Sequence, residues 1–148
     1  MGLDTTHDAW HGAYSAFNRW RNAVAEAAGY RIITPPRYNE PGFDPAFAGI
    51  GPYVDIDWDA VADKNYKGEW DTVPGDDPLI YLIVHSDCDG VIHPEQGRHL
   101  ALRLRELLPK LPENGDGHLA RYGVRGSTER FILGLDAAVT AGEDLEFH

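Results

Sequence analysis

The sequence is poor in cysteine, and its basic residues are outnumbered by acidic ones. Cys88 is the single cysteine among 148 residues, which excludes an internal disulfide and any zinc site built from several cysteines. Thirteen lysines and arginines face 24 aspartates and glutamates, giving a formal net charge of -11. Because binding to phosphate backbones or anionic lipid takes clustered cations, we expect no nucleic-acid partner and no membrane partner.

Long apolar runs and common catalytic motifs are also missing. No apolar stretch approaches bilayer-spanning length, and Met1-Gly2-Leu3-Asp4 lacks the basic and apolar regions of a secretory signal. We therefore expect a cytoplasmic protein, located in the host cell cytoplasm if a phage encodes it. The sequence has no Gly-x-Ser-x-Gly, no glycine-rich phosphate loop and no His-Glu-x-x-His. Acyl transfer, P-loop nucleotide hydrolysis and zincin proteolysis thus have no support.

Apolar spacing predicts three main helices. We expect them over 8–28, from Pro94 to a stop at Pro109, and from a cap at Ser127 to Gly142. The apolar run 79–84 predicts a buried strand, which could pair with 53–58 or with the C-terminal stretch. The sequence therefore predicts a compact, helix-rich α+β fold with a small sheet, formed by residues 1–148 as a single domain.

Proline and glycine concentrate in residues 34–52. This Pro/Gly-rich loop contains Pro35, Pro36, Pro41, Pro45 and Pro52, with Gly42, Gly49 and Gly51. Loops of this length inside a domain are uncommon and often functional, so one interpretation is a lid over a site. We favour the alternative of a surface wrap pinned by Tyr38, Phe43 and Phe47.

Polar side chains concentrate directly after the predicted strand. His85, Asp87 and Asp89 alternate, and Gly90 follows them at an expected sharp turn, as in the first half of a calcium loop. An imidazole stands where calcium prefers oxygen, and Gln96 stands where the bidentate carboxylate would be. This mixture favours Zn, Mn or Fe over Ca as a possible divalent metal ion.

His7 and His11 are four residues apart on the first predicted helix, a spacing that places two imidazoles on one face. We predict that a metal ion would be held by His7, His11, His85, Asp87 and Asp89. Two alternatives stay open: the histidines could be satisfied by backbone or carboxylate groups, and the aspartates could cap the next helix.

A ligand site is predicted around the same segment. Its residues are His85, Asp87, Asp89 and Gly90, with aromatic side chains from the first helix, Trp10 and Tyr14. Cys88 lies between two carboxylates, which disfavour a reactive thiolate, so we expect it to have a buried packing role.

Three stretches resemble an uncharacterised family of small proteins of tailed phages, actinobacteria and their prophages. They are MGLDTTHDAWHGAYSAFNRWR, DPLIYLIVHSDCDGVIHPEQGRHLALRLRELLPKL and FILGLDAAVTAGEDLEFH. The resemblance implies a phage or prophage accessory protein and carries no activity. A weaker resemblance joins His85, Asp87, Asp89 and Gly90 to the first metal motif of DHH-type phosphoesterases. The chain has no Asp-His-His triplet downstream of it.

These observations favour a non-enzymatic binding module that uses the His85–Asp89 loop to take a small ligand, a cation or a host protein. The first alternative is a phosphoesterase-like hydrolase, in which a divalent metal ion activates water. The second is a purely structural polar hub that joins the predicted strand to two helices, with a role in protein interaction.

Overall fold

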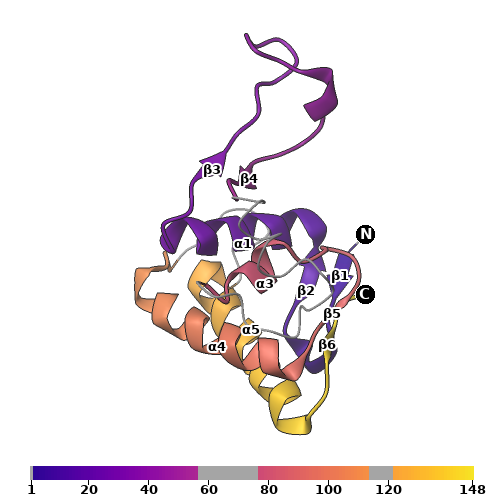
Figure 1. Cartoon of the computed structure of the whole chain (residues 1–148), viewed down its shortest axis with the longest axis vertical. Helices are drawn as coiled ribbons and strands as arrows, with labels where there is room; N and C mark the ends of the chain where they lie inside the picture. The colour runs from indigo at the N-terminus through magenta and orange to yellow at the C-terminus, as the bar shows by residue number, and fades with distance from the viewer. Residues whose placement is uncertain (1, 57–76, 114–121) are drawn as a thin grey trace.

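The computed structural model describes residues 2–56, 77–113 and 122–148. Three long helices dominate these residues: α1 (Tyr14–Ala27), α4 (Pro94–Leu107) and α5 (Gly123–Ala141). The shorter elements are β1 (Gly2–Asp4), η1 (Thr6–Asp8), β2 (His11–Ala13), β3 (Ile32–Ile33), η2 (Pro45–Phe47), β4 (Tyr53–Val54), α3 (Ile80–Ile83), β5 (Val91–Ile92), η3 (Leu108–Lys110) and β6 (Leu145–Glu146). The predicted α+β class is confirmed (Figure 1).

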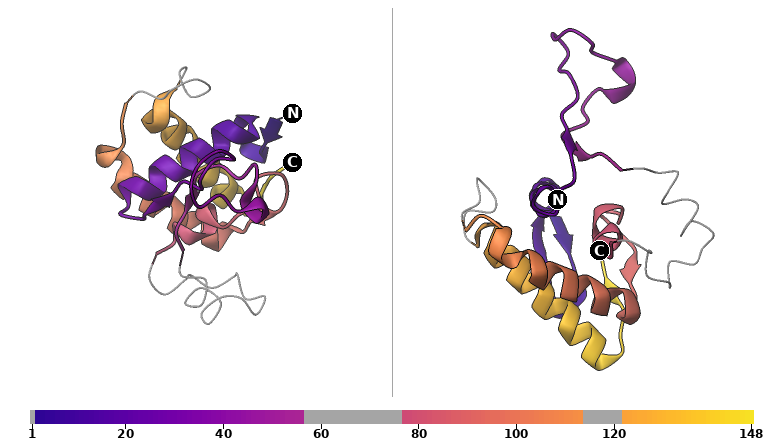
Figure 2. Two further views of the ribbon diagram at one scale, coloured as in Figure 1. Left: turned by 90° about the horizontal axis from the view of Figure 1, so that it is seen from above. Right: turned by 60° about the vertical axis from the view of Figure 1, so that its left-hand side comes forward.

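The helices α4 and α5 lie side by side, with α1 packed across them (Figure 2). Apolar side chains at helical spacing fill the space between them, including Phe17 and Trp20 of α1, Leu104 of α4 and Phe131 of α5, all fully buried. The turn after η1 approaches α5 closely at Gly134. A side chain on Gly134 would begin 2.6 Å from the Cα atom of Ala9, so this position requires glycine.

The strands form separate antiparallel pairs in place of the single small sheet that we predicted: β1 with β2, β3 with β4, and β5 with β6. An isolated bridge joins Thr5 to Phe147. The backbone N–H of Asp4 donates to the carbonyl of His148 at 2.8 Å, and that of His148 donates back at 2.9 Å. The described ends of the chain therefore lie beside each other (Figure 1).

The first helix begins six residues later than predicted, at Tyr14 instead of Asp8. Residues 2–13 form a β-hairpin in which Gly12 pairs with Leu3. His7 and Asp8 both take a φ of 56° in its turn, and Thr5 Oγ1 accepts from the backbone N–H of Trp10 at 2.9 Å. The hairpin satisfies backbone groups that the predicted helix would have used, and Gly12 is the residue that disfavours helix here.

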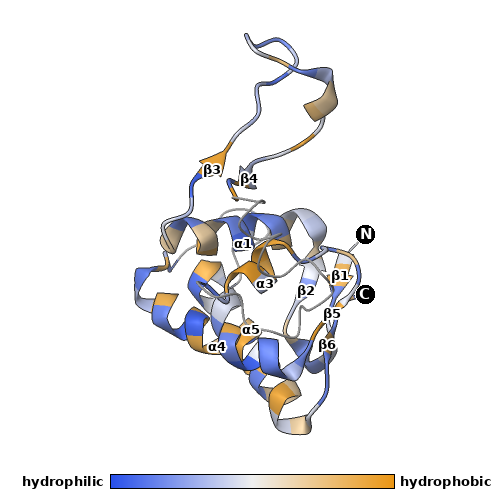
Figure 3. Ribbon diagram, viewed as in Figure 1, coloured by the Kyte–Doolittle hydropathy of each residue, from blue (hydrophilic) through white to orange (hydrophobic). Residues whose placement is uncertain are grey.

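Within the apolar run 79–84, Ile80–Ile83 form the short helix α3, so the predicted buried strand is wrong. Asp77 Oδ1 accepts from the N–H of Leu79 at 3.0 Å, in the turn that leads through Pro78 into α3. Asp-Pro is a helix-start pattern. All four residues of α3 are buried, and Figure 3 colours this helix mainly as hydrophobic. A run that is apolar at every position has no periodicity that separates a strand from a helix.

The last helix begins at Gly123, so Ser127 is a buried residue of its interior and not its cap. Its end was predicted correctly, because Gly142 takes the left-handed conformation with a φ of 68°. Pro94 begins α4 as predicted.

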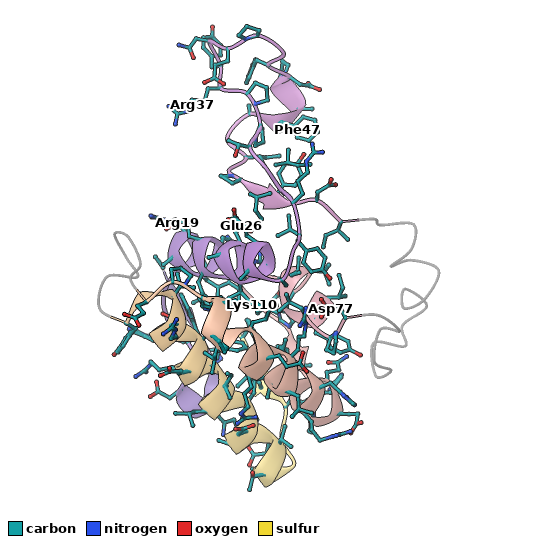
Figure 4. The ribbon with its side chains drawn as sticks, turned by 90° about the vertical axis from the view of Figure 1, so that its left-hand side faces the viewer. Arg19, Glu26, Arg37, Phe47, Asp77 and Lys110 are labelled. Carbon is teal, nitrogen blue, oxygen red and sulfur yellow. The ribbon has the colours of Figure 1, made fainter. Side chains whose placement is uncertain are left out.

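Residues 34–52, here called the arm, project away from the helices on the far side of α1 (Figures 1 and 4). Arg37 and Phe47 are labelled on it in Figure 4. The predicted surface wrap is wrong, because Tyr38 is 86% exposed and Phe47 44% exposed. The strands β3 and β4 hold the base of the arm, and Asn22 Nδ2 of α1 donates to the carbonyl of Pro52 at 2.9 Å.

None of the helices in the part of the chain described here has the length and apolar character needed to cross a membrane.

Candidate ligand-binding sites

The His85 ring is held between backbone carbonyls and an aromatic side chain. Its Nδ1 lies 2.8 Å from the carbonyl oxygen of Ser86, and its Nε2 lies 3.0 Å from that of Val91. The ring packs on Phe147 with centroids 4.1 Å apart. Because carbonyl oxygens only accept and a neutral imidazole has a single N–H, the ring donates to one of these two carbonyls in each tautomer. A metal ion on either ring nitrogen would have to displace the carbonyl oxygen that now faces it.

Gly90 makes this packing geometrically allowed. It takes a φ of 96°, as the predicted sharp turn requires. A Cβ atom at this position would lie 3.3 Å from the Cε1 atom of His85. The glycine therefore lets the turn close directly over the imidazole.

Asp87 is committed to α1. Its Oδ2 accepts from Asn18 Nδ2 at 2.7 Å, and the carboxylate also acts on Arg21. Burial lowers the pKa of the Arg21 guanidinium, and the nearby Asp87 charge opposes that shift. Arg21 Nη1 in turn donates to the carbonyl of His85. Asp87 thus ties the loop to the helix and does not cap α4.

Asp89 is exposed and carries no ion pair within the described residues. Its Oδ1 accepts a long hydrogen bond from Cys88 Sγ at 4.0 Å. Cys88 itself is exposed, so the expected buried packing role is wrong. In this loop, Cys88 and Asp89 are exposed to solvent, whereas His85 and Asp87 form hydrogen bonds within the protein.

The five predicted metal ligands do not come together. His7 Nε2 pairs with Glu143 at 3.3 Å, and His11 Nδ1 pairs with Asp4 across the β-hairpin. The expected shared helix face does not exist, because His7 lies in η1 and His11 in β2. Across residues 2–56, 77–113 and 122–148, no group of three His, Cys, Asp or Glu side chains could hold a metal ion. A bound divalent ion stays a prediction, and elemental analysis tests it.

A hollow of about 460 Å³ adjoins the loop. This His85 hollow is lined by Tyr81, Val84, His85, Asp89, Ile92 and Gln96, among others. The Gln96 side chain is 3% exposed. Its Oε1 accepts from the N–H of His93 at 3.0 Å, while its Nε2 has no partner within the described residues. The hollow therefore offers apolar walls, an amide donor and the Asp89 carboxylate.

A second hollow, of about 320 Å³, lies near the hairpin and the start of α5. This Trp10 hollow is lined by Asp8, Trp10, Gly12, Tyr122, Ser127 and Arg130, among others. Trp10 is 6% exposed, and its Nε1 has no hydrogen-bond partner among the residues that the structure describes. A buried donor without an acceptor lowers the free energy of unfolding by about 1–3 kcal/mol, and an acceptor bound at this position would recover that loss.

Aromatic side chains separate the two hollows. Phe17 lies 5.2 Å from Trp10 and 5.8 Å from Phe147 between ring centroids, and Phe147 packs on His85. Trp10 and His85 therefore lie at opposite ends of one cluster, and the structure does not place Trp10 in the hollow of the predicted ligand residues. Tyr14 packs against the core and is not among the residues that line either hollow.

Gln96 and Arg130 are the site residues that sequence reasoning missed. A signal existed for Gln96, because a glutamine at the third position of a helix that begins with Pro94 often reaches back to the preceding backbone. No local sequence signal marked Arg130, because its place in the same hollow as Trp10 depends on how the hairpin packs on α5.

Compared with known proteins, the chain matches no protein-family model, no curated protein and no solved structure.

Proposed function

We propose that this protein is a non-enzymatic binding module that takes a small molecule in the His85 hollow, as an accessory protein of the phage or prophage type. One observation carries the proposal: Asp89 and Gln96 line the same hollow, and within the described residues Asp89 has no ion pair and Gln96 Nε2 no hydrogen-bond partner. A concave, largely apolar site with a few unused polar groups is the usual form of a small-molecule site.

The chemistry of the hollow favours an organic amine. An ammonium group would pair with the Asp89 carboxylate, and an oxygen acceptor on the same molecule would receive the Nε2 donor of Gln96. Tyr81, Val84 and Ile92 offer contact area to an apolar body. The net charge of -11 attracts cations over longer distances.

A titration with phenylalaninamide tests this proposal, because that probe carries an ammonium group, a carbonyl oxygen and an apolar ring. Saturable changes in the backbone amide NMR signals of residues 81–96 are the expected result. N-acetylphenylalaninamide keeps the ring and the carbonyl and lacks the charge, so it should bind about tenfold more weakly. Equal binding of the two probes would contradict the role of Asp89.

Two variants locate the binding. Asp89→Asn should weaken phenylalaninamide binding by about fivefold or more and leave the melting temperature unchanged. Asp55→Asn makes the same charge change at an exposed position beside β4, outside the hollow, and should leave binding unchanged. An equal loss in both variants would mean that general charge, and not the hollow, attracts the probe.

A structural hub is the second candidate, favoured by the internal hydrogen bonds of His85 and Asp87. As a hub, the loop joins α1, α3 and the C-terminal segment and binds nothing itself. No response to either probe, together with loss of folding in Asp87→Ala, would favour this candidate over the binding module.

A further inference from the structure

The Trp10 hollow is lined by a residue with a polar atom that no described residue hydrogen-bonds. Trp10 is 6% exposed and stacks on Trp20 with centroids 5.1 Å apart, so its ring is fixed in place. Its Nε1 has no hydrogen-bond partner within residues 2–56, 77–113 and 122–148. The indole N–H is only a donor, so a ligand that satisfies it must bring an acceptor.

Gly12 lies beside this donor and brings no side chain that would cover it. A Cβ atom on Gly12 would have Trp10 Nε1 as its nearest neighbour, at 3.6 Å, and Gly12 itself lines the hollow. The missing side chain therefore leaves the buried indole N–H uncovered by residue 12, on the side where Gly12 lines the hollow.

Arg130 supplies a positive charge to the same hollow. Its guanidinium lies over the Tyr122 ring at 4.6 Å and reaches Asp8 Oδ2 at 3.5 Å. That distance is at the limit of a hydrogen bond, and the Asp8 side chain is 84% exposed. The pairing is therefore weak, and a better-placed acceptor could replace Asp8.

We propose that the Trp10 hollow is a second binding site, separate from the His85 hollow, and that it receives a carboxylate through Trp10 Nε1 and the Arg130 guanidinium. A planar carboxylate matches the guanidinium fork. The nearby Asp8 and the net charge of -11 favour an anion with one charge over a doubly charged phosphate. Ala9, Ala13 and Ala16 leave room for a small apolar body.

The indole N–H signals in a ¹⁵N NMR spectrum test the site directly. The Trp10 signal is assigned by its loss in Trp10→Phe and should move on titration with benzoate. The Trp20 signal is the internal control, because its Nε1 already donates to Thr128 Oγ1 at 2.9 Å. Benzamide, which has the same shape without the charge, should bind about tenfold more weakly.

Three variants separate Arg130 from a general effect of charge. Arg130→Gln should weaken benzoate binding by about tenfold or more, and Arg130→Lys should weaken it less, because lysine keeps the charge but loses the fork. Asp8→Asn should tighten binding by about twofold or more, because it removes the competing acceptor. Circular dichroism checks that each variant folds.

The carboxylate could come from a free organic acid or from the C-terminus of a peptide. Titrations with N-acetylalanylalanine, and with the same dipeptide carrying a C-terminal amide as its uncharged control, separate these two sources. Binding of benzoate supports a free acid, and binding of the peptide acid alone supports a peptide end. A Trp10 signal that stays unmoved by millimolar concentrations of both acids would overturn the proposal. So would equal binding of benzoate and benzamide.

Discussion

At the His85 hollow, both nitrogens of the His85 ring face backbone carbonyls and Asp87 is bonded to Asn18. At the Trp10 hollow, a more deeply buried nitrogen, Trp10 Nε1, has no hydrogen-bond partner in the described part of the chain. The two ends of one aromatic cluster thus differ in how much of their polar chemistry the fold itself uses. A segment rich in ligand-type residues can be occupied with holding the chain together, while an aromatic residue counted as core can present the unused group.

The largest effect is expected at Gly134, on which the Trp10 end is built. Gly134→Ala should destabilise the protein by about 1–3 kcal/mol, because its Cβ atom would overlap Ala9 beside Trp10. Gly97→Ala is the matched control, since its Cβ atom would meet Leu135 and Val139 side chains at an ordinary 3.5 Å. Urea denaturation measures both. Equal stability of the two variants would show that the hairpin does not rest on α5 as tightly as described.

The next largest effect concerns the two aspartates of the loop. Asp87→Ala should cost about 1–2 kcal/mol, because it removes a hydrogen bond to a charged group and leaves Arg21 with less compensation. Asp89→Ala should stay within about 0.5 kcal/mol, since Asp89 is exposed and unpaired in the described residues. A larger loss from Asp89 than from Asp87 would reverse our division of the loop into an internal and an open part.

Two buried tryptophans give a matched pair for the unused donor. Trp20→Phe should destabilise the protein by about 1 kcal/mol more than Trp10→Phe, because only Trp20 loses a buried hydrogen bond, the one to Thr128. Both changes remove the same ring atoms, and both side chains are buried. Thermal or urea unfolding compares them. If Trp10→Phe costs as much, its indole N–H has a partner after all.

The smallest effect is at the surface of α4 near the His85 hollow. Hydrogen bonds from Arg98, at 2.7 Å, and from His99 lower the pKa of the Glu95 carboxyl. A carboxyl whose pKa is lowered by folding stabilises the protein above its ordinary pKa, and that contribution is lost as the pH falls through the lowered value. Arg98→Ala should therefore raise the pKa of Glu95 in an NMR titration. Its stability at neutral pH should not change measurably, because the pair is exposed.

Local signals in the sequence were sufficient where one element decides its own structure. Pro94 and the leucine stripe predicted α4, Gly142 predicted the end of α5, and Gly90 predicted a sharp turn at its own position. The helix α3 was missed because a buried apolar run has no period, although Asp77 and Pro78 marked its start.

The candidate site was less predictable because it depends on contacts far apart in the chain. The helical interpretation of residues 8–13 placed His7 and His11 on one face, but the hairpin turns them toward Glu143 and Asp4. Local spacing gave no sign that Phe17 and Phe147 would stand between Trp10 and His85. Local spacing also gave no sign that Arg130 and Trp10 would line the same hollow.

The reciprocal hydrogen bonds between Asp4 and His148 hold the first and last described segments of the chain next to each other. A short glycine-rich linker could join these ends, and the chain could then be opened within the exposed arm, because circular permutation succeeds at such positions. The permuted protein would keep both hollows intact, so the contribution of a continuous arm could be measured separately from that of the helical body.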